Sequence, residues 1–330
     1  MQAQTVFLSL LLSGLSISSH GTEDIPLFEK FRKFEQIYEP SGVHQLPDGR
    51  FVVVEDEAVH PLDVFSLQTD GQVSEQPLYR SSLLSWNSPN RVLKTLEDLE
   101  AVAVDEQGRV YAITSHSRKE NGKRDDKREQ LARFGLEGEQ IVNFQVMRGL
   151  RKKIAAKHDS LKDATRIRDV KDGGGFNIEG LSFDADKQNL LIGLRSPLAG
   201  ENAIVIVMEN PQAVFDHDEK PRISDRLIEL DLAGGGIRAM SYDPHLGGFL
   251  IISRKPEKSF KLWLWSGDVG ESPQRLRIPD IKNLRQAEGV TPVLIDGRPA
   301  GILVVSDDGF GLKRKPGHYL FLRYEQLGRK

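Results

Sequence analysis

Acidic, basic and histidine side chains recur at matching positions in five segments of this chain. Each segment has a short apolar stretch, a turn rich in Asp, Gly or Pro, and a second apolar stretch. The segments are Ser41–Asp56, Glu100–His116, Glu179–Arg195, Arg238–Arg254 and Glu288–Asp307. Carboxylates bind Ca²⁺ and Mg²⁺, histidine exchanges protons near neutral pH, and arginine binds anionic groups. The repeat therefore predicts a site whose residues come from several segments.

The side-chain types divide the candidate residues into three groups. Acidic residues that open segments are candidate ligands for Ca²⁺ or Mg²⁺, residues at segment ends are candidate acid–base catalysts, and arginines are candidate binding groups for an anionic substrate. The metal ligands are Glu100, Glu179 and Glu288, the catalytic residues are His116, Asp56 and Asp307, and the substrate-binding residues are Arg195, Arg254 and Arg118. Together they suit metal-assisted hydrolysis of a small anionic ester, phosphoester or lactone.

The same residues allow a structural alternative. Carboxylates and arginines at neighbouring segment ends can pair with each other and so fix adjacent units of the repeat. In that case the protein is a non-catalytic module that binds a ligand or a protein partner. Both interpretations stay open from the sequence, and so does the question of whether the protein is an enzyme.

The repeated segments must form the elements that position these residues. Two apolar stretches joined by a tight polar turn are typical of a β-hairpin, and a further β-like stretch follows most segments, for example Pro61–Leu67. Three or four antiparallel strands per unit, repeated around an axis, predict an all-β β-propeller with five blades. Six blades are the second choice, because Gln68–Asp98 is long enough to contain more strands. The first strand starts and the second strand ends on the same face, so the polar ends should form one rim of the central channel.

Two other stretches complete this architecture. Met147–Asp172 has a helical composition, which predicts a helical insertion around residues 147–172. The basic stretch Arg148–Lys157 within it is interpreted as a solvated insertion in preference to a binding site. Phe28–Tyr38 is expected to supply the fourth strand that the last unit lacks, which would close the ring by joining the chain ends.

The N-terminus predicts export. Val6–Ile17 is an apolar run that is shorter than the about 20 residues of a membrane span and matches the core of a secretory signal. We therefore expect a signal peptide over residues 1–20, a single propeller domain over residues 21–330, and a periplasmic or secreted location in a bacterium.

Composition limits the partners. The 330 residues include 45 Lys and Arg and 48 Asp and Glu, a net charge of −3, so no nucleic-acid partner is expected. The chain has no Cys, which excludes disulfides, thiolate metal sites and cysteine nucleophiles. We expect a monomer without a membrane span or organic cofactor, whose partner is a small anionic molecule or another protein.

Four stretches of the chain resemble a known family. They are Asp98–Lys119, Phe176–Asp184, Leu190–Asn210 and Ala287–Pro292, and the strings SHSRK and LRSPL are the most specific parts. They resemble the bacterial domain of unknown function 3616 family over most of the chain from Ser41 onward. That resemblance implies a β-propeller and no established activity. The Glu-Gly pairs that open units are also similar, more distantly, to phytase-like and calcium-dependent lactonase propellers.

Overall fold

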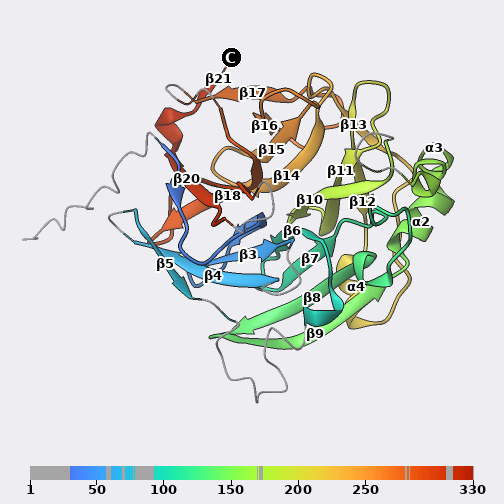
Figure 1. The fold of residues 1–330 in the computed structure, drawn as a ribbon, viewed down its shortest axis with the longest axis horizontal. Helices are drawn as coiled ribbons and strands as arrows, with labels where there is room; N and C mark the ends of the chain where they lie inside the picture. Colours follow the sequence, from blue (N-terminus) through green and yellow to red (C-terminus); the bar gives the residue numbers. More distant parts are fainter. Residues whose placement is uncertain are drawn as a thin grey trace, which may run out of the picture.

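Five antiparallel sheets surround one axis and form the blades of a β-propeller (Figure 1). The structure is a computed structural model, and it describes residues 30–56, 61–68, 71–76, 78, 93–168, 170, 174–278, 281, 283–309 and 315–329. The prediction of an all-β propeller with five blades is confirmed, in preference to six. The predicted signal peptide, residues 1–20, lies outside the described residues.

Each blade is a sheet of at least four strands. The innermost strands are β2, β6, β10, β14 and β18, and they contact one another around the channel. The first blade is β2 (Pro40–Gln45), β3 (Phe51–Glu55), β4 (Leu62–Leu67) and β5 (Val73–Gln76). The second is β6 (Leu99–Val104), β7 (Val110–Thr114), β8 (Gln130–Glu137) and β9 (Gln140–Arg148). The third is β10 (Asn177–Asp184), β11 (Asn189–Ser196), β12 (Ala203–Met208) and β13 (Ile228–Leu230). The fourth is β14 (Gly236–Asp243), β15 (Gly248–Arg254), β16 (Lys261–Trp265) and β17 (Gln274–Arg277).

Both chain ends take part in closing the ring. The fifth blade is β18 (Ala287–Ile295), β19 (Arg298–Ser306) and β20 (His318–Arg323), and its fourth strand is the N-terminal β1 (Arg32–Lys33). The pairing of β1 with β20 confirms the closure expected from Phe28–Tyr38. The C-terminal β21 (Gly328–Arg329) also pairs with β17, as a fifth strand at the edge of the fourth blade.

Helices lie at the periphery of the strands (Figure 1). The insertion after β9 forms α2 (Leu150–Lys157), α3 (Asp159–Lys162) and the short 3-10 helix η4 (Ala164–Arg166), which confirms the helical insertion. A further helix, α4 (Pro211–Asp216), starts at a proline after β12, and three more 3-10 helices are η2 (Leu93–Thr95), η3 (Asp126–Arg128) and η5 (Tyr324–Gln326). Within the described ranges, no helix combines the length and the apolar character that a membrane crossing requires.

The core lies between neighbouring blades. Every residue of β3 and β7 is buried, which agrees with their nearly continuous apolar sequences. Between the second and third blades, for example, the rings of Tyr111 and Phe183 stack with centroids 6.0 Å apart. Burial of one large apolar side chain contributes about 1.5–3 kcal/mol, so these layers hold the blades in the fixed orientation that a site at the channel needs.

Candidate functional site

A β-bulge marks the same place in every innermost strand. Near the start of each innermost strand the register with the second strand skips one residue, and these residues are Ser41, Glu100, Glu179, Arg238 and Glu288. A bulge leaves its extra residue out of the ladder and redirects the side chain, and bulges are common beside active sites. The five residues that open the repeated segments are therefore the five bulged residues, which places one polar side chain per blade at the channel mouth.

Glycine follows three of these bulged residues because the innermost strands approach each other closely. A Cβ atom on Gly42 would lie 3.0 Å from the Cα of Ala101 in the next blade. A Cβ atom on Gly289 would lie 3.0 Å from the backbone nitrogen of Val43. The Glu-Gly pairs of the sequence thus combine a channel-facing carboxylate with a backbone position that has no room for a side chain.

One side of the rim is an ion-pair network, which we call the paired arc (Glu179, Arg195, Arg238 and Glu288). Glu179 Oε2 lies 2.6 Å from Arg238, and Glu179 Oε1 lies 2.7 Å from Arg195. Arg238 also pairs with Glu288. Burial, opposed in part by Arg238, raises the pKa of Glu288 to about 7. The carboxylates of this arc are therefore occupied by guanidinium groups, as the structural alternative expected.

Two more predicted residues lie beside the paired arc. The guanidinium carbon of Arg254 lies 5.0 Å from the ring centroid of Phe260, and burial together with Arg238 and Arg195 lowers the pKa of Arg254. Asp307 accepts a hydrogen bond of 2.7 Å from the Gly309 backbone, and burial raises its pKa. Neither residue lines the cavity described next.

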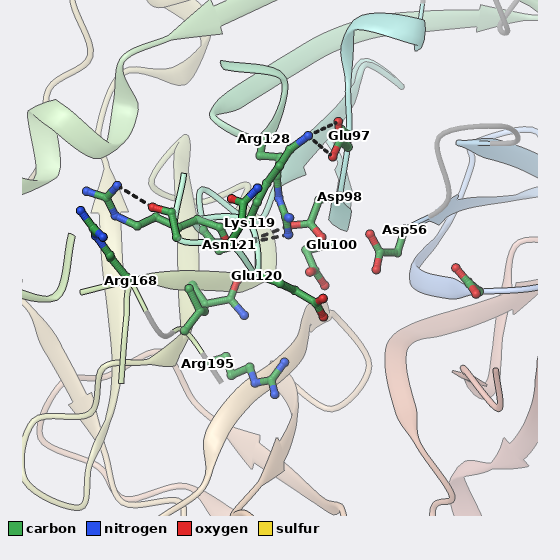
Figure 2. Close-up of a pocket in the computed structure, with 16 residues that line it drawn as sticks. Asp56, Glu97, Asp98, Glu100, Lys119, Glu120, Asn121, Arg128, Arg168 and Arg195 are labelled. Carbon is green, nitrogen blue, oxygen red and sulfur yellow. Dashed lines mark hydrogen bonds and ion pairs between the residues drawn. The ribbon is translucent and has the colours of Figure 1, made fainter. Parts of the chain in front are cut away.

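The other side of the rim opens into a cavity of ≈ 970 Å³, and we call it the open arc (Asp56, Asp98 and Glu100). Figure 2 shows these three carboxylates directed toward a common space, with Arg195 on the opposite wall. The walls also include Arg118, Lys119, Arg128 and Arg168, mostly from the segment after β7. The cavity therefore brings acidic and basic groups together around a space large enough for a small molecule.

Asp98 is the most firmly held of these carboxylates. Its Oδ2 accepts hydrogen bonds from Ser115 and, at 3.4 Å, from Ser117, and it pairs with Arg128. Arg128 also donates to Ser117 at 3.1 Å. Asp98 itself is 8% exposed and has a φ of 66°, a left-handed conformation that Asp tolerates better than most residues. These donors hold the Asp98 side chain in place at the cavity wall.

Asp56 forms a carboxyl pair with Asp98. The Asp56 side chain is exposed, and desolvation where it lies in the cavity, together with the neighbouring Asp98, raises the pKa of Asp56 to about 9. Asp56 therefore carries a proton at neutral pH. A protonated acid beside a fixed carboxylate is an arrangement that can donate one proton and accept another.

Glu100 adds a third acidic group. Burial, followed by the carboxylates of Glu179 and Asp98, raises the pKa of Glu100 well above its usual range. Unlike Glu179 and Glu288, it makes no ion pair with any described residue. Glu100 thus lies at the junction of the two arcs and is the one predicted metal ligand that pairs with no arginine among the described residues.

The basic residues that line the cavity, which we call the basic wall (Arg118, Lys119 and Arg195), are held by local contacts. Lys119 lies 3.0 Å from Glu97 and 2.7 Å from Asp125, and Arg118 donates to the Gly122 carbonyl at 3.1 Å. Arg195 faces the cavity while paired with Glu179. Of the three predicted substrate-binding arginines, Arg118 and Arg195 therefore line the cavity, and Arg254 lies beside the paired arc.

His116 is turned away from this space. Its φ of 56° directs the chain so that the side chain is buried, with Nδ1 2.8 Å from the Thr114 carbonyl. Burial lowers the pKa of His116 to about 4, so the ring is neutral at pH 7. The residue does not line the cavity, and Asp56 is the one predicted catalytic residue that does.

The predicted metal ligands do not fit a Ca²⁺ or Mg²⁺ ion. Both oxygens of Glu179 and Oε1 of Glu288 are engaged by arginines, so Glu100 is the one predicted ligand without an arginine partner among the described residues. In the part of the chain that the structure describes, no group of three or more His, Asp or Glu side chains is arranged to hold a metal ion. The ion stays a prediction from the sequence.

Sequence reasoning missed Asp98 and Arg128. Asp98 lies two residues before the bulged Glu100 and so falls outside the aligned positions of the repeat. Its position before a strand in an Asp-Leu-Glu string was the available signal. Arg128 comes from the charged stretch Ser117–Arg128, whose mixed composition does not indicate which residue reaches the channel.

Comparison with known proteins gives one family match. A family model described as "Phytase-like: Esterase-like activity of phytase" matches residues 37–262. No curated protein matches the chain. A protein of unknown function from Bacteroides thetaiotaomicron has 9% sequence identity and a TM-score of 0.39, with 89% of this chain and 73% of that chain covered. A gluconolactonase from Xanthomonas campestris has 12% identity and a TM-score of 0.38, with 90% and 84% covered.

Proposed function

This chain belongs to the phytase-like family, and from that premise we propose that it is a hydrolase that cleaves an ester bond of a small anionic molecule in the open arc. A phosphoester or a lactone is included in this class. The observation that carries the proposal is the pair formed by Asp56, whose raised pKa keeps it protonated at neutral pH, and Asp98, which Arg128 and two serine hydroxyls hold at the cavity wall.

The two carboxyl groups divide the acid–base work. Asp98 removes a proton from a water molecule as its oxygen attacks the carbonyl carbon or phosphorus atom. Asp56 gives its proton to the oxygen of the leaving alcohol as the bond to that oxygen breaks. One proton is accepted and one donated, so the pair returns to its starting state when the proton passes from Asp98 back to the neighbouring Asp56.

The basic wall binds and orients the substrate. Arg195 and Arg118 can each hold an anionic oxygen with paired N–H donors, and Lys119 adds a point charge on the same wall. Arg195 lies across the cavity from the carboxyl pair (Figure 2), and Arg118 and Lys119 line the same cavity. A substrate with a negative charge close to its ester bond would therefore be held with that bond beside Asp56 and Asp98.

A non-catalytic binding protein is the second candidate, and the paired arc favours it. Carboxylates that are committed to Arg238 and Arg195 stabilise the blades rather than a reaction. On this alternative the cavity binds an anionic ligand without changing it.

The finer family resemblance and the predicted location also remain proposals. We infer from the sequence likeness that the chain is a member of the domain of unknown function 3616 group, and from residues 1–20 that it acts in the periplasm or outside the cell.

Hydrolysis of simple probes tests the proposal. The purified protein is assayed with p-nitrophenyl acetate, p-nitrophenyl phosphate and γ-butyrolactone at pH 7, with and without added Ca²⁺. We expect one probe to be hydrolysed and Asp98→Asn to lower kcat by about 100-fold or more, the usual contribution of a general base. The matched control is Asp186→Asn, which removes an exposed carboxylate far from the cavity. Saturable binding of an anionic probe without turnover would instead support the binding protein.

A further inference from the structure

A second cavity lies outside the channel, in the helical insertion. Its volume is ≈ 450 Å³, and it is bounded by α2, α3, η4 and the segment around Arg118 and Arg124. Six of its ten lining residues are Arg or Lys, and Asp159 is the one acidic residue among them. The cavity is therefore strongly basic, although the whole chain has a net charge of −3.

Two arginines of this cavity, the exposed Arg124 and the buried Arg151, share a single acidic partner. Arg124 pairs with Glu129 at 2.6 Å and Arg151 pairs with the same carboxylate at 2.7 Å. Burial, together with repulsion from Arg124 and Arg118, lowers the pKa of Arg151. One carboxylate thus faces two guanidinium groups, and a third, Arg118, lies on the same wall.

The remaining basic residues are weakly compensated. Lys162 lies 3.8 Å from Asp159 and Arg166 lies 3.3 Å from Asp163, but both pairs are between exposed side chains and contribute little. Lys152 makes no ion pair with the residues that the structure describes. Ala155 and Ala156 line the same cavity with small side chains, which leaves space between the cations.

We propose that this cavity binds an oxyanion group with two negative charges, a phosphate or a sulfate. The guanidinium groups of Arg124, Arg151 and Arg166 present planar N–H donors that match the oxygens of such a group, and Lys152 adds a mobile charge. The single charge of Glu129 balances only part of the repulsion that Arg124 and Arg118 exert on Arg151. A bound group with two negative charges would reduce that repulsion further. The proposal takes up the alternative interpretation of Arg148–Lys157, that of a binding site, and it does not depend on hydrolysis in the open arc.

Calorimetric titration with sodium phosphate tests the site. The full chain is titrated in low-salt buffer at pH 7.5, and the variant is the double substitution Lys152→Ala with Arg166→Ala. Loss of one charge-assisted contact weakens binding by about tenfold or more, so we expect one phosphate per chain and a loss of about 100-fold in the variant. The matched control is Arg226→Ala with Lys258→Ala, which removes one exposed Arg and one exposed Lys elsewhere.

Two further arms make the result decisive. Thermal unfolding of each variant reports whether it is folded, because Lys152 and Arg166 are exposed and their removal should leave the midpoint nearly unchanged. Vesicles that contain phosphatidic acid test whether the phosphate belongs to a lipid head group, since its capture by the wild type and not by the double variant also supports the site. The proposal is overturned if neither soluble phosphate nor these vesicles bind, or if the control variant loses as much affinity as the cavity variant.

Discussion

Arg238 is the residue on which the paired arc depends, and its removal has a calculable cost. Its side chain is 7% exposed, and its partners Glu179 and Glu288 are 2% and 14% exposed. In an Arg238→Met variant, Glu179 keeps Arg195, but Glu288 loses its ion-pair partner. Removing one member of a buried ion pair costs about 3–5 kcal/mol. We expect the free energy of unfolding at pH 8 to fall by that amount.

The pH dependence of the lost stability shows whether the unpaired Glu288 causes it. The pKa of Glu288 in the folded protein is about 7, above the value of about 4.3 in an unfolded chain. A carboxyl group with a raised folded pKa destabilises the fold as the pH rises above its unfolded pKa, and loss of Arg238 raises the folded pKa further. The penalty of Arg238→Met should therefore be largest at pH 8 and clearly smaller at pH 5.5, where Glu288 is protonated in the folded variant.

Urea unfolding at the two pH values measures both effects. Arg254→Met is the matched control, because Arg254 lies on the same rim, stacks on Phe260 and should cost about 1 kcal/mol or less. Adding Glu288→Gln to Arg238→Met should restore part of the loss at pH 8. A loss below about 1 kcal/mol for Arg238→Met, or an equal loss at both pH values, would refute the electrostatic explanation of this arc.

Three other predictions follow from the same structure. Burial and Glu55 raise the pKa of Asp63 to about 10, so the folded state takes up a proton that the unfolded chain releases near pH 4, and stability falls as the pH rises. Asp63→Asn should therefore gain at least about 1 kcal/mol in urea unfolding at pH 8, with a smaller gain at pH 4. The rate of hydrolysis in the open arc should decline above pH 9, because Asp56 loses its proton there, and a pH–rate profile measures this decline. Gly236→Ala would place a Cβ against the Arg195 carbonyl and should lower stability by about 1–3 kcal/mol in thermal unfolding, whereas Gly270→Ala meets no atom within 4 Å and should have little effect.

The blades could be predicted because they are local. Two apolar stretches joined by a polar turn predict each hairpin, and repetition of that unit indicates the propeller. The closure by β1 was also predictable, since the last unit lacked a strand. By contrast, β21 is only two residues long and pairs with β17 because the chain end happens to pass the edge of the fourth blade. A contact of that kind leaves no pattern in the sequence.

The rim could be predicted only in outline. The register placed Glu100, Glu179 and Glu288 at the channel mouth, and the bulges explain why. The choice between ion pairs and open carboxylates depends on which guanidinium reaches which oxygen, and that is determined by side-chain packing across blades. His116 shows the same limit, because its backbone conformation buries a side chain that the aligned position would direct to the rim.

Titration of the Asp56 carboxyl group tests the central claim most directly. Protein with ¹³C-labelled aspartate carboxyl carbons is followed by NMR from pH 4 to pH 10.5, and the Asp56 signal is assigned by its absence from Asp56→Asn. We predict a carboxyl that is still protonated at pH 7.5 and titrates near pH 9, as expected for a group that is desolvated beside Asp98. An Asp56 signal that titrates near pH 4, the ordinary range for aspartate, would contradict the shared-proton pair and the hydrolytic role built on it.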